Sequence, residues 1–294
     1  MAVHCRALLA FGVLKPVRPP DSDLLRWLAP AGSGPDEFAA TRPLFEQWLS
    51  RSPGKAVYSV NTRSIYRIDD DTNGPIAIKE LRFESAAGRL RATTIRRHRV
   101  LCEFRAQAAF HARGGNTPRL FGAALEFNRG LITRVFILMS WVDSARTMSI
   151  DVGDLGDDER DAAFKQYAQF FVRSAQLGLV HGRHSSENIL VTDGKRDFCV
   201  IDFSHAQLCR AYHPLGFARD VARIGARLVI EESCSAAAVR LLFSHVVRAA
   251  PRSTVTEAVL RKEFNHVLST SKRQQKILRQ MRTLWRGWPF RLHQ

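Results

Sequence analysis

Hydrophobic and polar residues alternate in the stretch that begins near residue 55, and this alternation predicts short β-strands. The expected strands are Lys55–Val60, Ser64–Ile68 and Pro75–Leu81. Two longer strands are expected at Leu120–Phe127 and Ile132–Val142, on either side of a turn that contains Gly130. This part of the chain is therefore predicted to form a small β-sheet.

Apolar residues at three- and four-residue spacing predict helices in the rest of the chain. One helix, Val100–Ala112, lies between the predicted strands and stops at Gly114. After residue 143 the chain is mainly helical, with helices expected at 157–177, 215–231, 236–249 and 254–269. A small sheet with one helix, followed by a helical region, is typical of an α+β fold with two lobes.

These patterns divide the chain into four predicted segments. Residues 1–50 are rich in proline, glycine and serine and contain the short amphipathic pieces Asp23–Leu28 and Leu44–Leu49, so we expect an N-terminal extension that is partly helical and partly loop. Residues 51–142 form the predicted β-rich lobe and residues 143–270 the helical lobe. Residues 271–294 are expected to form a basic amphipathic helix, with Ile277, Met281, Leu284 and Trp288 along one side.

The composition is that of a folded globular protein. The chain has 294 residues, of which 45% are hydrophobic, and 44 Lys and Arg against 28 Asp and Glu give a net charge of +16. No apolar run reaches the roughly 18–20 residues that span a bilayer, and the short run Ala7–Leu14 lacks a typical signal-peptide cleavage site. The five cysteines are scattered without a C-x-x-C pair, which argues against a zinc ribbon or a disulfide framework and favours the cytoplasm.

The positive charge predicts an anionic partner. Seven Lys and Arg residues and no acidic residue occur from Phe264 to Gln294, and Trp285 and Trp288 lie near the end of this segment. Such a segment fits the surface of an acidic membrane. The alternative is a terminal helix that packs its apolar stripe on the domain, and nucleic acid is a less favoured partner than either.

The most informative stretch runs from Leu179 to Ser204. His181 is followed seven residues later by Asn188, and Asp202-Phe203-Ser204 comes after a predicted buried strand. This order resembles the H-x-D-x-x-x-x-N loop and the D-F-G motif of the kinase-like phosphotransferase superfamily, in its H-G-D variant. Upstream, Ile76–Lys79 resembles the V-A-I-K strand of these proteins. The resemblance implies a two-lobed protein-kinase-like fold.

The resemblance also implies roles for individual residues. Asn188 and Asp202 would be the oxygen ligands of Mg²⁺, and Lys79 would hold the α- and β-phosphates of ATP. Glu103, in the predicted helix, is the favoured partner of Lys79, with Glu80 and Glu84 as alternatives. Trp141 follows the strand beside which an adenine ring would lie, although core packing explains it equally well, and Asp220 resembles the helix aspartate that braces the catalytic loop.

Within this superfamily the chain is most similar to the lipopolysaccharide core kinases, which phosphorylate Kdo or heptose sugars. The similar stretches are Glu103–Ala106, Gly114–Gly122, Phe136–Ala145 and Ile201–Ala206. The resemblance implies an anionic, lipid-linked sugar as the partner, at the cytoplasmic face of the inner membrane. Protein Ser/Thr kinases share the same motifs, so a protein remains an alternative phosphate acceptor.

Two departures from the kinase pattern bear on activity. Arg183 occupies the position of the catalytic aspartate, and a guanidinium cannot act as a base at physiological pH. The segment Val57–Arg63 contains no glycine, so the usual glycine-rich phosphate loop is absent. Ser204 in place of the D-F-G glycine is a smaller change.

Three functional hypotheses follow from this pattern. The favoured one is a nucleotide-binding pseudokinase that acts through a protein partner. The second is an active ATP-dependent kinase of core sugars or of a protein Ser/Thr, in which His184 or His181 partly replaces the missing base. The third is a non-catalytic module that binds membranes or nucleic acid through its positive charge.

Overall fold

In the computed structural model the described residues are 14–17, 25–30, 35–50, 55–60, 62–69, 74–143, 145–192, 197–231, 234–251 and 255–270. The predicted C-terminal helix 271–294 lies outside this range. The chain divides into two compact units. The first unit comprises Met1–Asp143 together with Asp202–His205, and the second comprises Ser144–Ile201 and Ala206–Gln294.

A seven-stranded antiparallel sheet forms the framework of the first unit. The strand order is β1-β2-β6-β7-β5-β4-β3. The strands are β1 (Leu14–Val17), β2 (Leu25–Pro30), β3 (Tyr58–Val60), β4 (Arg63–Ile68), β5 (Ile76–Arg82), β6 (Leu120–Asn128) and β7 (Leu131–Ser140). All five strands predicted after residue 55 are present, and β5 lies inside the sheet between β4 and β7.

The N-terminal part of the chain differs from the prediction of helix and loop. Residues 25–30, which overlap the amphipathic piece Asp23–Leu28, form strand β2 and pair with β6. Leu25, Trp27 and Ala29 alternate along β2 and contribute to the core on one face of the sheet, which is the two-residue period of a strand. The surrounding prolines and glycines hid this short period in the sequence. The helical part is α2 (Pro35–Ser50), which contains the second piece, Leu44–Leu49.

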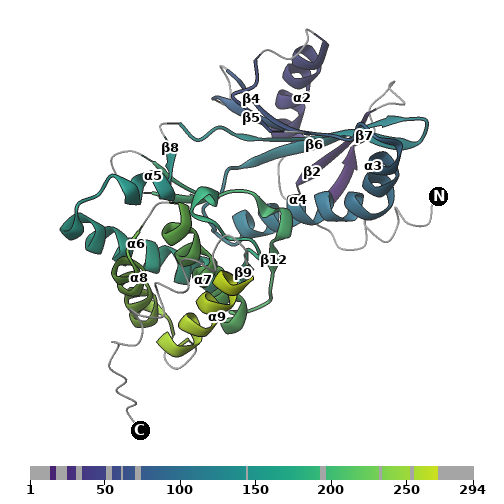
Figure 1. Ribbon diagram of the computed structural model, residues 1–294. Helices are drawn as coiled ribbons and strands as arrows, with labels where there is room; N and C mark the ends of the chain where they lie inside the picture. The colour runs from purple at the N-terminus through teal and green to yellow at the C-terminus, as the bar shows by residue number, and fades with distance from the viewer. Residues whose placement is uncertain are drawn as a thin grey trace. The chain divides into compact units, whose positions relative to one another are not determined.

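Helices cover both faces of this sheet, as Figure 1 shows. On one face, Phe45 of α2 packs in a core with Trp27, Tyr66 and Phe136. On the other face, Phe104 of α4 (Arg97–Ala112) packs in a second core. That core also includes Leu125 of β6, Val135 and Ile137 of β7, and the partly buried Leu81 of β5. The residues of β5 consequently point alternately toward α2 and toward α4.

The chain enters α4 through two short helical segments that the sequence did not predict. Helix α3 (Ala86–Arg91) is capped by Ser85, whose Oγ accepts a hydrogen bond from Gly88 N, and a π-helical turn, η1 (Ala92–Arg96), follows it. Thr93 Oγ1 in this turn accepts a hydrogen bond from Ile132 N of β7 at 2.8 Å. This contact fixes the turn to the sheet and sets the position at which α4 begins, three residues before the predicted start.

The second unit is mainly helical, as predicted. Its strands are β8 (Ala145–Thr147), β9 (Leu179–Val180), β10 (Ile189–Thr192), β11 (Phe198–Val200) and β12 (Gln207–Leu208). Its α-helices are α5 (Met148–Gly153), α6 (Asp157–Gln176), α7 (Pro214–Glu231), α8 (Ala236–Ala249) and α9 (Glu257–Ser269). Helices α6 to α9 begin and end within three residues of the predicted limits.

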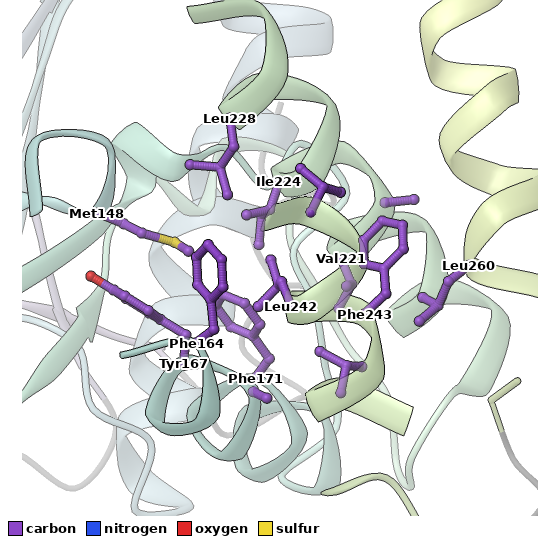
Figure 2. Close-up of a cluster of buried hydrophobic side chains, with 14 of the residues drawn as sticks. Met148, Phe164, Tyr167, Phe171, Val221, Ile224, Leu228, Leu242, Phe243 and Leu260 are labelled. Carbon is purple, nitrogen blue, oxygen red and sulfur yellow. The ribbon is translucent and has the colours of Figure 1, made fainter. Parts of the chain in front are cut away.

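Aromatic and aliphatic side chains of the long helices form the core of the second unit. Figure 2 shows Phe164, Tyr167 and Phe171 of α6 gathered with Ile224 of α7 and Leu242 of α8. Ser235 and Thr256 cap the first turns of α8 and α9 through their hydroxyl oxygens, which explains where these helices begin. Within the described part of the chain, the helices are too short or too polar to cross a membrane.

Candidate functional site

Lys79 of β5 is directed by the alternation of its strand. Ile76 and Ile78 belong to the core beneath α2, whereas Leu81 packs in the core beneath α4. Lys79 has the same parity as Leu81, so its side chain extends toward α4. Its neighbour Glu80 points to the opposite face of the sheet.

The ammonium group of Lys79 lies between two carboxylates. Nζ donates a hydrogen bond to Glu103 Oε1 of α4, and it lies 3.3 Å from Asp202 Oδ1. Burial disfavours the charge on Lys79, but the two carboxylates outweigh this effect, so the pKa of Lys79 lies above its usual value. The lysine is therefore held as a cation in a fixed place within the first unit.

The other two glutamates considered as partners of Lys79 have different surroundings. Glu80 is fully buried on the α2 side and accepts hydrogen bonds from Tyr66 Oη at 3.1 Å and Arg82 Nη2 at 2.9 Å. Glu84 is exposed in the segment that follows β5. The structure therefore brings only Glu103, of these three, into contact with Lys79 in the described part of the chain.

Asp202 reaches the first unit through a short 3-10 turn, η3 (Phe203–His205). Phe203 is fully buried and packs against Phe110 of α4, with ring centroids 5.7 Å apart. Asp202 has a φ of 59°, a left-handed conformation that aspartate tolerates better than most residues. Such backbone strain is a feature of functional sites.

Asp202 is an ionised carboxylate at neutral pH. Burial disfavours its charge, but the positive charge of Lys79 and a hydrogen bond from Ser204 outweigh burial. The positive charge of Arg63 adds to this effect, so the pKa of Asp202 lies below its usual value. About a third of the side chain, 32%, is exposed. Asp202 is therefore a charged oxygen donor that a cation can reach.

Trp141 follows β7 and is held by contacts within the first unit. Its backbone N–H donates to Pro75 O at 2.8 Å, and the guanidinium of Arg67 lies 5.6 Å from its ring centroid. The ring is half-buried. The cation–π contact gives Trp141 a structural partner of its own, beside the adenine-stacking role that the sequence suggested.

In the second unit, Asp220 of α7 fixes the loop that begins at His181. Its two carboxylate oxygens accept hydrogen bonds from the backbone N–H groups of His181 at 2.6 Å and Gly182 at 3.0 Å. Arg223, one turn further along α7, donates to both Gly182 O and Asp220 Oδ1. Gly182 has a φ of +76°, where a side chain would be strained. These hydrogen bonds fix the backbone of the loop to α7.

His181 and His184 both lie in the interior of this unit. Their rings stack at 4.4 Å with an interplanar angle of 10°, and their exposed fractions are 1% and 8%. His181 Nε2 makes a hydrogen bond to Ile201 O at 3.0 Å, while His184 lines a small cavity with Phe171 and Ser174. Burial, followed by the charges of His181 and Arg223, holds the pKa of His184 well below its usual value.

These positions bear on the sequence-based suggestion that one of the two histidines replaces the missing base. A base must be within hydrogen-bond reach of the proton it removes. The Nε2 atom of His181 already makes a hydrogen bond to a backbone carbonyl. His184 faces a small cavity, and its lowered pKa makes it a poor proton acceptor. Neither imidazole is placed to serve an acceptor hydroxyl in solvent.

Arg183 and Asn188 occupy the exposed side of the loop. The Arg183 side chain is exposed, and its backbone carbonyl accepts a hydrogen bond from Asn188 Nδ2 at 3.2 Å. This bond uses the nitrogen end of the Asn188 side chain and leaves the oxygen end to interact with a cation. The backbone of Asn188 is fixed as well, because Ile201, the residue before Asp202, donates its N–H to Asn188 O at 3.0 Å.

The fold of this chain is kinase-like, and one solved structure with a TM-score above 0.5 resembles it. The chain resembles WaaP in a complex with acyl carrier protein, with a TM-score of 0.53 and 15% sequence identity over 78% of this chain and 91% of that one. A MAP kinase from Leishmania major also matches, with a TM-score of 0.44 and 17% identity over 82% of this chain and 70% of that one. Identities of this size concern the fold alone.

The amino-acid sequence identifies the family to which the chain belongs. A model of the RIO domain matches residues 77–227, which is more than half of the chain, and the chain therefore belongs to the RIO domain family. No curated protein matches it in sequence. These findings confirm the predicted α+β, kinase-like fold.

Two contributors to the site were not singled out by the sequence. Arg223 of α7 donates a hydrogen bond to the loop. In the sequence, only its position one turn after Asp220 could have indicated this role. Arg63 acts on Asp202 from β4. Its signal was strand alternation, because Arg63 and Ile65 share one face of β4 and Ile65 pairs with Lys79.

Proposed function

We propose that this chain is a nucleotide-binding pseudokinase, a kinase-like protein that binds ATP with Mg²⁺ but lacks efficient phosphoryl transfer. The arrangement of Lys79 between Glu103 and Asp202 carries this proposal. A buried lysine that two carboxylates keep charged is suited to hold phosphate oxygens, and the exposed part of Asp202 is suited to hold a cation.

The loop of the second unit that begins at His181 lacks a group that efficient phosphoryl transfer needs. Phosphoryl transfer needs a group that accepts or orients the proton of the attacking hydroxyl. Arg183 stands where that carboxylate would be, and its guanidinium stays protonated at every physiological pH. The two nearby imidazoles face the interior. Positioning alone would then leave, at most, slow transfer.

Asp202 and Asn188 are the proposed ligands of Mg²⁺. Both offer oxygen atoms, which magnesium prefers, and Asp202 is ionised under physiological conditions. Bound there, the cation would neutralise part of the triphosphate charge. The contribution of the chain itself is to hold Lys79 in place through Glu103 and to aim Asp202 through the buried Phe203.

The first test is the thermal stability of the full chain with and without ATP and Mg²⁺. We expect Mg-ATP to raise the melting temperature of the wild type, and we expect Lys79→Ala and Asp202→Ala to abolish this rise. Lys262→Ala is the matched control, because Lys262 is an exposed lysine on α9 of the second unit. A wild type whose melting temperature does not respond to Mg-ATP would contradict the proposal.

The second test separates the pseudokinase from an active kinase. With labelled ATP, we expect the wild type to transfer phosphate to lipopolysaccharide core sugars or to protein serines slowly at most, and we expect Arg183→Asp to transfer it faster. Transfer by the wild type that is lost in Asp202→Ala would instead favour the active kinase. The Arg183→Asp chain should still bind Mg-ATP, which serves as its internal control.

For the partner, we propose an anionic surface or an acidic protein. The net charge of +16 supports this choice, as does the basic segment 271–294. The structure of WaaP that resembles this chain contains acyl carrier protein, which supports a protein partner for a chain that lacks a proton acceptor. Lipopolysaccharide core or the acidic inner face of a membrane fits the same charge.

A further inference from the structure

Arg63 is the first residue of β4 and lies beside the turn that joins β3 to β4. Across the sheet it pairs with Leu81, and two residues further along β4, Ile65 pairs with Lys79. Residues two apart on a strand share a face, so Arg63 and Lys79 lie on the same face as diagonal neighbours. Diagonal neighbours of this kind are within reach of one another when the side chains are long.

The positive charge of Arg63 lies within electrostatic range of the Lys79 cluster. Its positive charge acts on the carboxylate of Asp202, in the same unit. The side chain is exposed, and its guanidinium makes no hydrogen bond or ion pair with another residue in the described ranges. The strand fixes the position of Arg63, and the five N–H donors of its guanidinium remain available to a ligand.

The cluster around Lys79 needs a further cation if it is to hold a triphosphate. Lys79 can contact phosphate oxygens, but together with Glu103 and Asp202 it forms a group with a net charge of −1, which even a Mg²⁺ ion at Asp202 raises only to +1. In kinases, the glycine-rich loop offers backbone N–H groups to the phosphates. The corresponding segment here, Val57–Arg63, contains no glycine that would let its backbone approach so closely.

We propose that Arg63 binds the terminal phosphates of the nucleotide and takes the place of the missing glycine-rich loop. A planar guanidinium can donate two parallel hydrogen bonds to a phosphate, which makes arginine well suited to this task. The inference rests on the proposed nucleotide binding. It assigns recognition of the phosphate chain to a side chain of β4, with Lys79 as the second cation.

The test compares ligands that differ only in phosphate number. Binding of ATP, ADP and adenosine to the full chain is measured by isothermal titration calorimetry, for the wild type and for Arg63→Gln. We expect Arg63→Gln to weaken ATP about tenfold, since the loss of a charged bidentate contact has this order of effect, and to leave adenosine unchanged. Arg63→Lys should recover part of the affinity, because it restores the charge without the planar fork.

Arg129→Gln is the matched control. Arg129 is an exposed arginine at the turn between β6 and β7 of the same sheet, and its removal changes the net charge equally. It should leave the affinity for ATP unchanged. If the wild type binds ATP and Arg63→Gln binds it equally well, or if adenosine weakens as much as ATP, the role of Arg63 is refuted. A wild type that binds no nucleotide would refute the proposed function itself.

Discussion

At the scale of single residues, strand parity decides which charged groups can work together. Lys79 and Glu80 are neighbours in the sequence, yet one faces α4 and the other is buried beneath α2. Motif spacing favoured Glu103 as the partner of Lys79 but left Glu80 and Glu84 open as alternatives. Parity could have done so, because only a residue on the α4 side can reach an odd-numbered position of β5.

The same scale gives a prediction for His184, whose neutral ring is buried and whose Nδ1 has no hydrogen-bond partner in the described structure. Burial first, and then the charges of His181 and Arg223, keep the pKa of His184 well below its usual value. The unfolded chain takes up a proton near pH 6.5, whereas the folded chain resists it. The free energy of unfolding should therefore fall as the pH drops below about 6.5, by at most about 1.4 kcal/mol per pH unit from this group.

The variant His184→Leu removes this titration. Urea unfolding between pH 5 and pH 7 should show a flatter dependence on pH than the wild type, and at pH 7 a gain of about 1 kcal/mol, because no unpartnered nitrogen remains buried. His111→Gln, at an exposed position of α4, is the control for the loss of a histidine as such. An unchanged slope in His184→Leu would contradict this account of the ring.

At the scale of elements, the long periodic segments could be predicted and the short ones could not. Helices α6 to α9 repeat their apolar positions over three or more turns, and the strands after residue 55 alternate clearly. Strand β2 has six residues, set among prolines and glycines, and its pairing with β6 is decided by residues nearly a hundred positions away. A non-local partner of this kind leaves no mark on the local pattern.

The candidate site shows a similar division. The order of Lys79, Glu103, Asn188, Asp202 and Asp220 could be read from motifs. Arg63 and Arg223 could not, because each acts through a neighbour that only the sheet register or the helix turn supplies. The inward orientation of His184 was also hidden, since its surroundings come from α6 and α7.

The element that covers the sheet on the side away from Lys79 gives a further prediction. Phe45 of α2 is 1% exposed and packs against Trp27 and Phe136, with both ring centroids 5.1 Å away. Phe45→Ala should lower the free energy of unfolding by about 3–4 kcal/mol, through lost burial and a residual cavity. Gln47→Ala, at an exposed position of the same helix, should change it by less than about 0.5 kcal/mol in denaturant titrations. Equal effects of the two variants would show that α2 does not stabilise the sheet.

At the scale of the whole molecule, the excess of positive charge predicts binding that depends on salt. We expect the chain to sediment with vesicles that contain phosphatidylglycerol at low salt and to be released as the ionic strength rises, since screening shortens the reach of each charge. A chain ending at residue 270 lacks seven Lys and Arg residues. It should sediment several-fold less.

Vesicles of neutral phosphatidylcholine provide the control for this experiment, because they retain the apolar interior without the negative surface. Equal sedimentation with both kinds of vesicle would point to apolar insertion instead of charge. Equal sedimentation of the full and the shortened chain would assign the attraction to the folded units and leave the terminal helix with a packing role.

The division of the chain between its units has a practical consequence for the design of truncated proteins. Four residues, Asp202–His205, are built into the first unit although the sequence on both sides of them belongs to the second. A fragment that stops at Asp143 would keep Lys79 and Glu103 but lose the carboxylate of Asp202 and the aromatic ring of Phe203 that anchors it against α4. A shortened chain that is meant to keep the cluster around Lys79 must therefore also supply residues 202–205.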